Sequence, residues 1–64
     1  MTLDRYLTDN NLSNAAFGVL IGVSGEAVRR YRNGTRWPDR ETLLAIEKAT
    51  RGRVTANDFV REVA

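Results

Sequence analysis

The sequence predicts an all-α fold, in which residues 1–64 form a single compact bundle of about five short helices. Two observations support this prediction. Apolar residues recur three and four positions apart along most of the chain, which is the spacing that places side chains on one face of a helix. The segments with this spacing are separated by asparagine and glycine, and most begin at a residue that caps helices. No segment carries a convincing strand pattern.

The first two helices are expected on either side of a turn at residues 9–11. Thr2 and Ser13 stand at their starts, where a hydroxyl accepts a hydrogen bond from an open backbone N–H. The turn sequence, Asp-Asn-Asn, tolerates left-handed backbone. The second helix covers roughly residues 14–21 and stops at Gly22. The apolar positions are Leu3, Tyr6 and Leu7 in the first helix, and Ala16, Phe17, Leu20 and Ile21 in the second.

The third and fourth helices follow the same logic. Ser24 caps the third, which runs to about Arg32 before Asn33-Gly34 provides a left-handed stop. Pro38-Asp39 opens the fourth, which runs to about Thr50 and is closed by glycine. The apolar positions that face inward are Ala27, Val28 and Tyr31 in the third helix, and Leu43, Leu44 and Ile46 in the fourth.

A short last helix is predicted near the end of the chain. Thr55 with Asp58 three residues later resembles a capping box, and the helix behind it carries Phe59 and Val63. Val54 is expected to fill the core from an extended segment before this helix. The main predicted core residues are Leu7, Phe17, Leu20, Ile21, Val23, Val28, Leu43, Ile46, Val54 and Phe59, and Tyr31 is expected in the core with its hydroxyl at the rim.

The composition argues against an enzyme. The chain has no Cys and no His, which removes disulfides, thiolate metal sites and the commonest general base at neutral pH. A chain of 64 residues also buries too little core for an enclosed active site. We therefore expect no catalytic residues, no metal and no cofactor. With no apolar run of about 18 residues and no signal peptide, we expect a cytoplasmic protein with no membrane partner.

The positive charge is concentrated in one stretch. The net charge of the chain is +2, and residues 24–40 alone carry +3. The charged residues of this stretch are Arg29, Arg30, Arg32, Arg36, Arg40, Glu26 and Asp39. Nine of the ten basic residues are Arg, whose planar guanidinium matches phosphate oxygens and guanine edges better than the ammonium of Lys. Such a run is either a solvated helix face or a surface for nucleic acid, and the motif beside it favours the second interpretation.

Residues 14–32 have the pattern of a helix-turn-helix. In this motif two helices cross at roughly 90–120° through a short turn. The crossing requires a small residue in the first helix, a glycine at the turn, and apolar residues wedged between the helices. Gly18 and Gly22 meet the first two requirements. The wedge residues are Phe17, Ile21, Val23, Val28 and Tyr31.

The sequence resembles the phage-repressor family of helix-turn-helix domains, the Cro/C1 group, and is more similar still to the small YdaS-like regulators, which are often described as antitoxins. The resemblance rests on Leu12-Ser13, Gly22-Val23-Ser24, Ala27-Val28, Tyr31-Arg32-Asn33-Gly34, Pro38, Ala45-Ile46-Glu47-Lys48-Ala49-Thr50, Gly52, Val54-Thr55 and Asp58-Phe59. It implies a five-helix, lambda-repressor-like fold. It also implies a bacterial or phage-encoded transcriptional regulator that binds double-stranded DNA sequence-specifically, commonly as a homodimer.

Two departures from the family pattern affect these expectations. Gly18 stands where the family usually has Ala, which should loosen the second helix by about 0.5–1 kcal/mol. Gly25 and Glu26 open the third helix where polar amides are common, so the preferred DNA sequence does not carry over from the family.

The base-reading candidates follow from the way this motif docks, with the amino-terminal part of its second helix against base edges in the major groove. The exposed residues there are Gly25, Glu26, Arg29 and Arg30. Arg29 and Arg30 are candidates for guanine O6 and N7. Glu26 is a candidate for accepting from a cytosine amino group.

Five further residues are candidates for phosphate contacts: Ser13, Ser24, Arg32, Thr35 and Arg36. The open N–H groups and the dipole at a helix start suit an anion, so Ser24 and Ser13 are placed there. Arg32, Thr35 and Arg36 are expected beyond the third helix, where the chain would run over the sugar-phosphate backbone.

Some of these assignments have a structural alternative. Ser24 can serve only as an N-cap. Glu26 can neutralise Arg29 or Arg30 on the same helix face instead of contacting a base. Trp37, which precedes a proline, either covers the edge of the core or forms a dimer contact.

A second function also remains open. The net charge of +2 is low for a tight DNA binder, so the same fold could serve as a protein-protein interaction module with a protein partner. Arg51 and Arg53 are expected to be solvated rather than functional.

Overall fold

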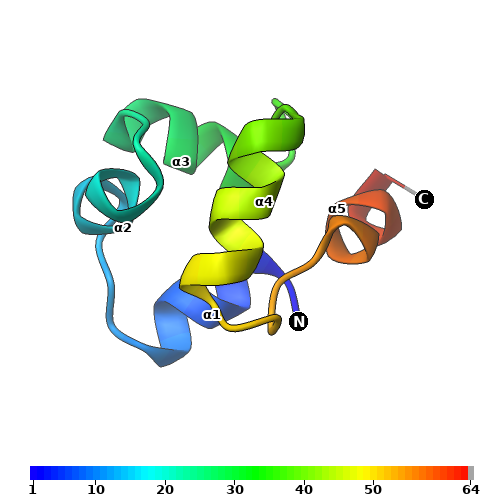
Figure 1. The fold of residues 1–64 in the computed structure, drawn as a ribbon, viewed down its shortest axis with the longest axis horizontal. Coiled ribbons are helices and arrows are strands. Elements are labelled where there is room, and N and C mark those ends of the chain that lie inside the picture. Colours follow the sequence, from blue (N-terminus) through cyan, green and yellow to red (C-terminus); the bar gives the residue numbers. More distant parts are fainter. Residues whose placement is uncertain (64) are drawn as a thin grey trace.

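Five helices make up the described part of the chain: α1 (Leu3–Asp9), α2 (Asn14–Ile21), α3 (Gly25–Asn33), α4 (Arg40–Ala49) and α5 (Ala56–Val63) (Figure 1). The structure is a computed structural model that describes the backbone of residues 1–63 and the side chains of residues 1–60. Within residues 1–63 there is no strand. The prediction of an all-α fold of five helices is confirmed. No helix in this range is long and apolar enough to cross a membrane.

The helices begin where their capping residues predict. Each N-cap side chain accepts a hydrogen bond from the backbone N–H three residues later, over distances of 2.8–3.1 Å. The four N-cap residues are Thr2, Ser13, Ser24 and Asp39. At α5 one half of the predicted box is present, because the Asp58 carboxylate accepts from the backbone N–H of Thr55 at 2.9 Å. The Thr55 hydroxyl does not cap the Asp58 N–H and instead donates to the same carboxylate at 3.3 Å.

The predicted stops are also present. Gly22 and Gly34 end α2 and α3 with φ angles of 77° and 78°, a left-handed conformation that glycine adopts without a steric penalty. Asn11, in the turn after α1, has a φ of 55°. The last turn of α4 is followed by a left-handed Gly52, whose N–H donates to the Glu47 carbonyl at 2.8 Å.

Seven of the ten predicted core residues are buried: Leu7, Phe17, Ile21, Val28, Ile46, Val54 and Phe59. Val23 and Leu43 pack against them and are partly buried. Ala27 and Tyr31, predicted to face inward from the third helix, are buried as well, and so is Leu3 of the first helix. The side chain of Val63, which was predicted to lie on the last helix, is outside the described side chains.

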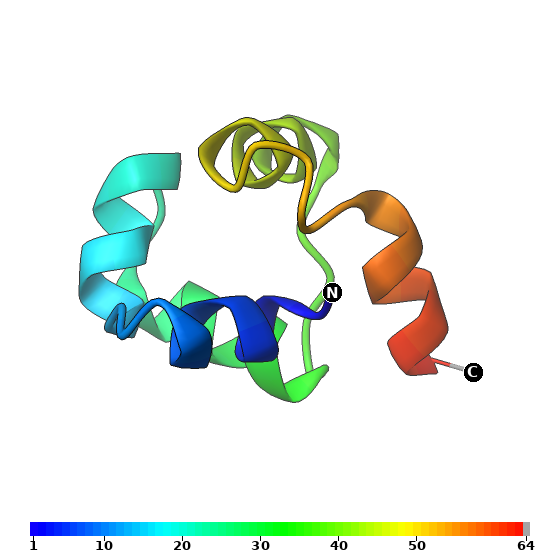
Figure 2. The same cartoon turned by 90° about the horizontal axis from the view of Figure 1, so that it is seen from below.

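Leu20 and Leu44 contradict the prediction. Leu20 was expected in the core and is 62% exposed, and Leu44 was expected to face inward and is 58% exposed. The arrangement of the helices gives the reason. In Figure 2, α4 lies on one side of the molecule, α1 and α3 lie on the other, and α2 and α5 lie at opposite ends. Because α5 is far from α2, no described element covers Leu20.

The expectation for Gly18 is also corrected. A Cβ atom at this position would lie 2.5 Å from the Val23 carbonyl oxygen and 3.2 Å from the Ser24 carbonyl carbon. The chain after the turn therefore passes directly over Gly18, and an alanine would clash with backbone. The low helix propensity of this glycine is the cost of that close approach, so Gly18 supports the packing rather than loosening it.

Candidate nucleic-acid interface

The turn between α2 and α3 fixes the position of the exposed face of α3. The Val23 N–H donates to the Gly18 carbonyl at 2.9 Å, and Ser24 begins α3 directly afterwards. A Cβ atom at Gly25 would lie 3.2 Å from both the Cα and the backbone N of Ala15. The start of α3 is thus pressed against the start of α2. Gly25, predicted to lie at base edges, is half-buried and has a packing reason for being glycine.

Three predicted base-reading residues meet on the exposed face of α3. The Glu26 carboxylate accepts from Arg29 Nη2 at 2.7 Å and from Arg29 Nε at 3.0 Å. It also accepts from Arg30 Nε at 3.3 Å. All three side chains are about half exposed. In the free protein Glu26 therefore pairs with both arginines and balances one of their two positive charges, in agreement with the alternative that it neutralises an arginine on its own helix face.

This cluster changes the titration of its members. The hydrogen bonds from the Arg29 guanidinium hold the pKa of Glu26 at about 2, below its ordinary value of 4.5, and Arg30 adds to the effect. The same pair raises the pKa of Arg29. Glu26 is therefore ionised throughout the physiological pH range, and its negative charge repels the phosphates of DNA.

The two helix starts proposed for phosphate differ in charge. Ser13 and Ser24 both act as N-caps, which uses one lone pair of each hydroxyl. The first turn of α2 carries no acidic residue, whereas the first turn of α3 carries Glu26. Because the acidic side chain of Glu26 offsets the positive end of the helix dipole at α3, the start of α2 keeps more of its positive potential.

Arg32 differs from its predicted placement. It was expected beyond the third helix and instead lies in the last turn of α3, with only 23% of its side chain exposed. Its guanidinium forms an ion pair with Asp4 of α1 at 2.8 Å, donates to Thr8 Oγ1 at 3.3 Å, and donates to Asn14 Oδ1 of α2 at 2.9 Å. Arg32 of α3 is therefore linked to both α1 and α2, and its charge is balanced by Asp4.

Thr35 and Arg36 lie in the loop after α3, as expected. Thr35 donates from its hydroxyl to Asn33 Oδ1 at 2.7 Å and from its backbone N–H to the Arg30 carbonyl at 3.1 Å, which orders the loop. Arg36 is exposed and has no ion pair among the side chains described.

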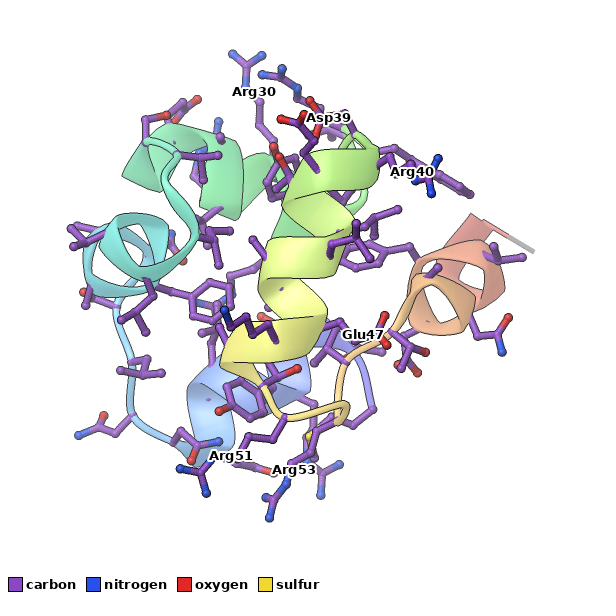
Figure 3. All side chains as sticks on the ribbon, in the orientation of Figure 1. Arg30, Asp39, Arg40, Glu47, Arg51 and Arg53 are labelled. Atoms are coloured by element: carbon purple, nitrogen blue, oxygen red, sulfur yellow. The ribbon has the colours of Figure 1, made fainter. Side chains whose placement is uncertain are left out.

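Arg40 is a cation that the sequence-based assignment left out. It is the first residue of α4 and lies at the same end of the molecule as Arg30, with Asp39 between them (Figure 3). The sequence could have indicated Arg40 as a candidate, because it lies within the positively charged stretch of residues 24–40. Arg51 and Arg53 lie at the opposite end of the molecule, away from this surface (Figure 3).

Trp37 is about half exposed, at 49%, while the following Pro38 is buried. The indole therefore covers the core edge only in part.

The short helical bundle, the glycine turn and the cationic face of α3 together define a helix-turn-helix DNA-binding regulator. A helix-turn-helix family model matches residues 3–55, and the chain belongs to this family, the Cro/C1 type. No curated protein and no solved structure matches the chain.

Proposed function

We propose that residues 1–64 act as one domain that binds double-stranded DNA sequence-specifically, with α3 in the major groove. The observation that carries this proposal is the cationic face of α3. Arg29 and Arg30 project from the helix on one side, while Ala27, Val28 and Tyr31 anchor the other side in the core. The biological role would be that of a transcriptional regulator of phage, prophage or antitoxin type.

The polar residues take distinct roles in this proposal. Arg29 and Arg30 contact base edges, and Glu26 either accepts from a cytosine amino group or keeps the arginines oriented. Gly25 lets the start of α3 approach α2 closely.

Phosphate contacts come from both sides of α3. Ser13, Ser24, Thr35 and Arg36 supply these contacts in the proposal. Arg32 holds α3 against α1 and α2 instead of reaching out to a phosphate.

A protein-interaction module remains the second candidate function. It is favoured by the exposed side chains of Leu20 and Leu44, which neither the core nor the cationic face uses.

An electrophoretic shift assay titrated with salt separates the two functions. Three cationic side chains on the proposed surface, Arg29, Arg30 and Arg36, should give a slope of log affinity on log salt of about −2 to −3, because neutral hydroxyl contacts release no counterions. Selection of bound sequences from a random duplex library would supply the preferred site. A slope near zero, or a selection without enrichment, would contradict sequence-specific DNA binding.

A further inference from the structure

An open polar hollow lies between α1 and the turn that follows α4, around a volume of about 320 Å³. Tyr6 and Asn10 line it from the α1 side. Arg51 and Arg53 line it from the turn, and the residues described around it include no acidic side chain. Neither arginine forms an ion pair among the described side chains. The hollow therefore presents two positive charges that no neighbour in the described part of the chain balances.

The turn that carries both arginines is fixed by Thr50, whose hydroxyl is buried. This hydroxyl donates to the Ile46 carbonyl at 2.8 Å and accepts from the backbone N–H of Val54 at 3.1 Å. The backbone N–H of Arg53 donates to the Thr50 carbonyl at 3.2 Å. Because these bonds hold the turn at both ends, the two guanidinium groups project from a preorganised backbone, which lowers the entropic cost of binding a ligand.

Arg51 is held in a conformation that arginine disfavours. Its φ is 56°, in the left-handed region that glycine adopts without a steric penalty. The negative end of the α4 dipole does not explain the choice, because Lys48 in the last turn of that helix already supplies a cation. A guanidinium kept at a strained position points to a ligand, since such strain concentrates at binding sites.

The hollow lies far from the face that we propose for DNA recognition. Arg30 projects at one end of the molecule, and Arg51 and Arg53 lie at the opposite end (Figure 3). A duplex held by α3 therefore leaves both of these arginines uncovered. A domain that is already bound to DNA also meets other segments of the same molecule at a high effective concentration, so even a weak second contact is populated.

We propose that Arg51 and Arg53 bind the phosphate backbone of a second DNA segment, so that one domain can bridge two duplexes. Planar guanidinium groups pair with phosphate oxygens in a forked geometry, and the polar side chains of Tyr6 and Asn10 border the same hollow. Backbone contacts carry no sequence information, so the second segment can have any sequence. The bridging rests on the proposed function of α3, whereas the second contact by itself does not.

Energy transfer between a donor-labelled and an acceptor-labelled duplex tests the bridging. The wild-type chain should raise the transfer, and a double variant, Arg51→Gly with Arg53→Gln, should need roughly tenfold more protein for the same signal. The affinity of this variant for a single duplex, measured by anisotropy, should stay within about twofold. Its melting temperature should not fall, because glycine relieves the left-handed backbone. Arg5→Gln is the control, since Asp9 already balances that guanidinium.

Two results of this assay overturn the proposal. One is a wild-type chain that binds a duplex and does not bridge. The other is bridging that the double variant retains, because two paired copies could join duplexes without these arginines.

Amide chemical shifts test the second contact with α3 disabled. In a variant with Arg29→Ala and Arg30→Ala, random duplex should still shift the signals of residues 50–54 and of the Asn10 side-chain amide. Signals that move only in residues 25–36 overturn the proposal. Saturation of the hollow by inorganic triphosphate at a lower concentration than by duplex also overturns it and identifies a small phosphorylated ligand instead. Because this measurement does not require α3, failure of the hollow and failure of the recognition helix are distinguishable.

Discussion

Glu26 holds Arg29 through two hydrogen bonds, of 2.7 and 3.0 Å, on the face of α3 that we propose for DNA. Because the two residues are three positions apart on one helix, the pair forms within α3 and does not depend on the rest of the fold. The free domain therefore presents its main cationic face with part of its charge already balanced.

Glu26→Gln should raise the affinity for random duplex by roughly threefold to tenfold, because it releases two guanidinium groups and removes a charge that repels phosphate. Affinity for the preferred site should rise less, so discrimination between sites should fall. Fluorescence anisotropy with both duplexes measures this change. Glu47→Gln, which removes an exposed carboxylate on α4 without an ion pair among the described side chains, is the control. Equal effects of the two variants would contradict the role of Glu26.

The same carboxylate makes stability depend on pH. The pKa of Glu26 is about 2 in the folded chain, against an ordinary 4.5, so its ion pairs stabilise the fold fully above pH 4.5. This stabilisation is lost as the pH falls through about 2. The melting temperature of the wild type should exceed that of Glu26→Gln at neutral pH, and the difference should vanish near pH 2. A difference that persists unchanged in acid would show that the ion pairs do not cause it.

Arg29 and Arg36 should separate base recognition from phosphate binding. Arg29→Ala should cost about 1–3 kcal/mol on the preferred site and relax the choice at one base pair. Arg36→Ala should weaken specific and random duplexes about equally and reduce the salt slope by about one. Both variants are measured on the best site, on its single-base variants and on random duplex at several salt concentrations. The opposite pattern would mean that α3 is not the recognition helix.

Arg32 should behave as a positioning residue. Arg32→Ala removes its contacts with Asp4, Thr8 and Asn14 and should lower the free energy of unfolding by about 1–2 kcal/mol. Affinity for the preferred site should fall while the salt slope stays unchanged. Arg32→Lys should not rescue either property, because one ammonium cannot span three partners in this geometry. A salt slope reduced by about one, with unchanged urea unfolding, would instead identify a phosphate contact.

Phe17 and Leu20 lie three residues apart on α2 and should respond very differently to truncation. Phe17 is fully buried, so Phe17→Ala should cost about 3–5 kcal/mol, comparable to the whole stability of a small domain. Leu20 is 62% exposed, so Leu20→Ala should change stability by less than about 0.5 kcal/mol. Urea unfolding followed by circular dichroism measures both. Similar losses would show that Leu20 belongs to the core after all.

The sequence alone determined the helix boundaries and the motif. Capping is a local interaction, so Ser13 and Ser24 could be assigned from their neighbours, and both form the predicted hydrogen bonds. Left-handed glycines such as Gly22 are equally local, because the conformation of one residue ends the helix. The pairing of Glu26 with Arg29 and Arg30 could also be predicted from the sequence, because these residues follow it by three and four positions on the same helix.

Only the tertiary structure decided which apolar residues are covered and what the long side chains reach. Helical spacing gives the direction of Leu20 but not whether another helix lies there, and α5 packs at the other end of the molecule (Figure 2). Arg32 meets Asp4 across 28 residues of sequence. Gly18 is required by the carbonyl of Val23 in the turn between α2 and α3, not by its own helix. These outcomes depend on contacts between elements, whose packing the local pattern does not specify.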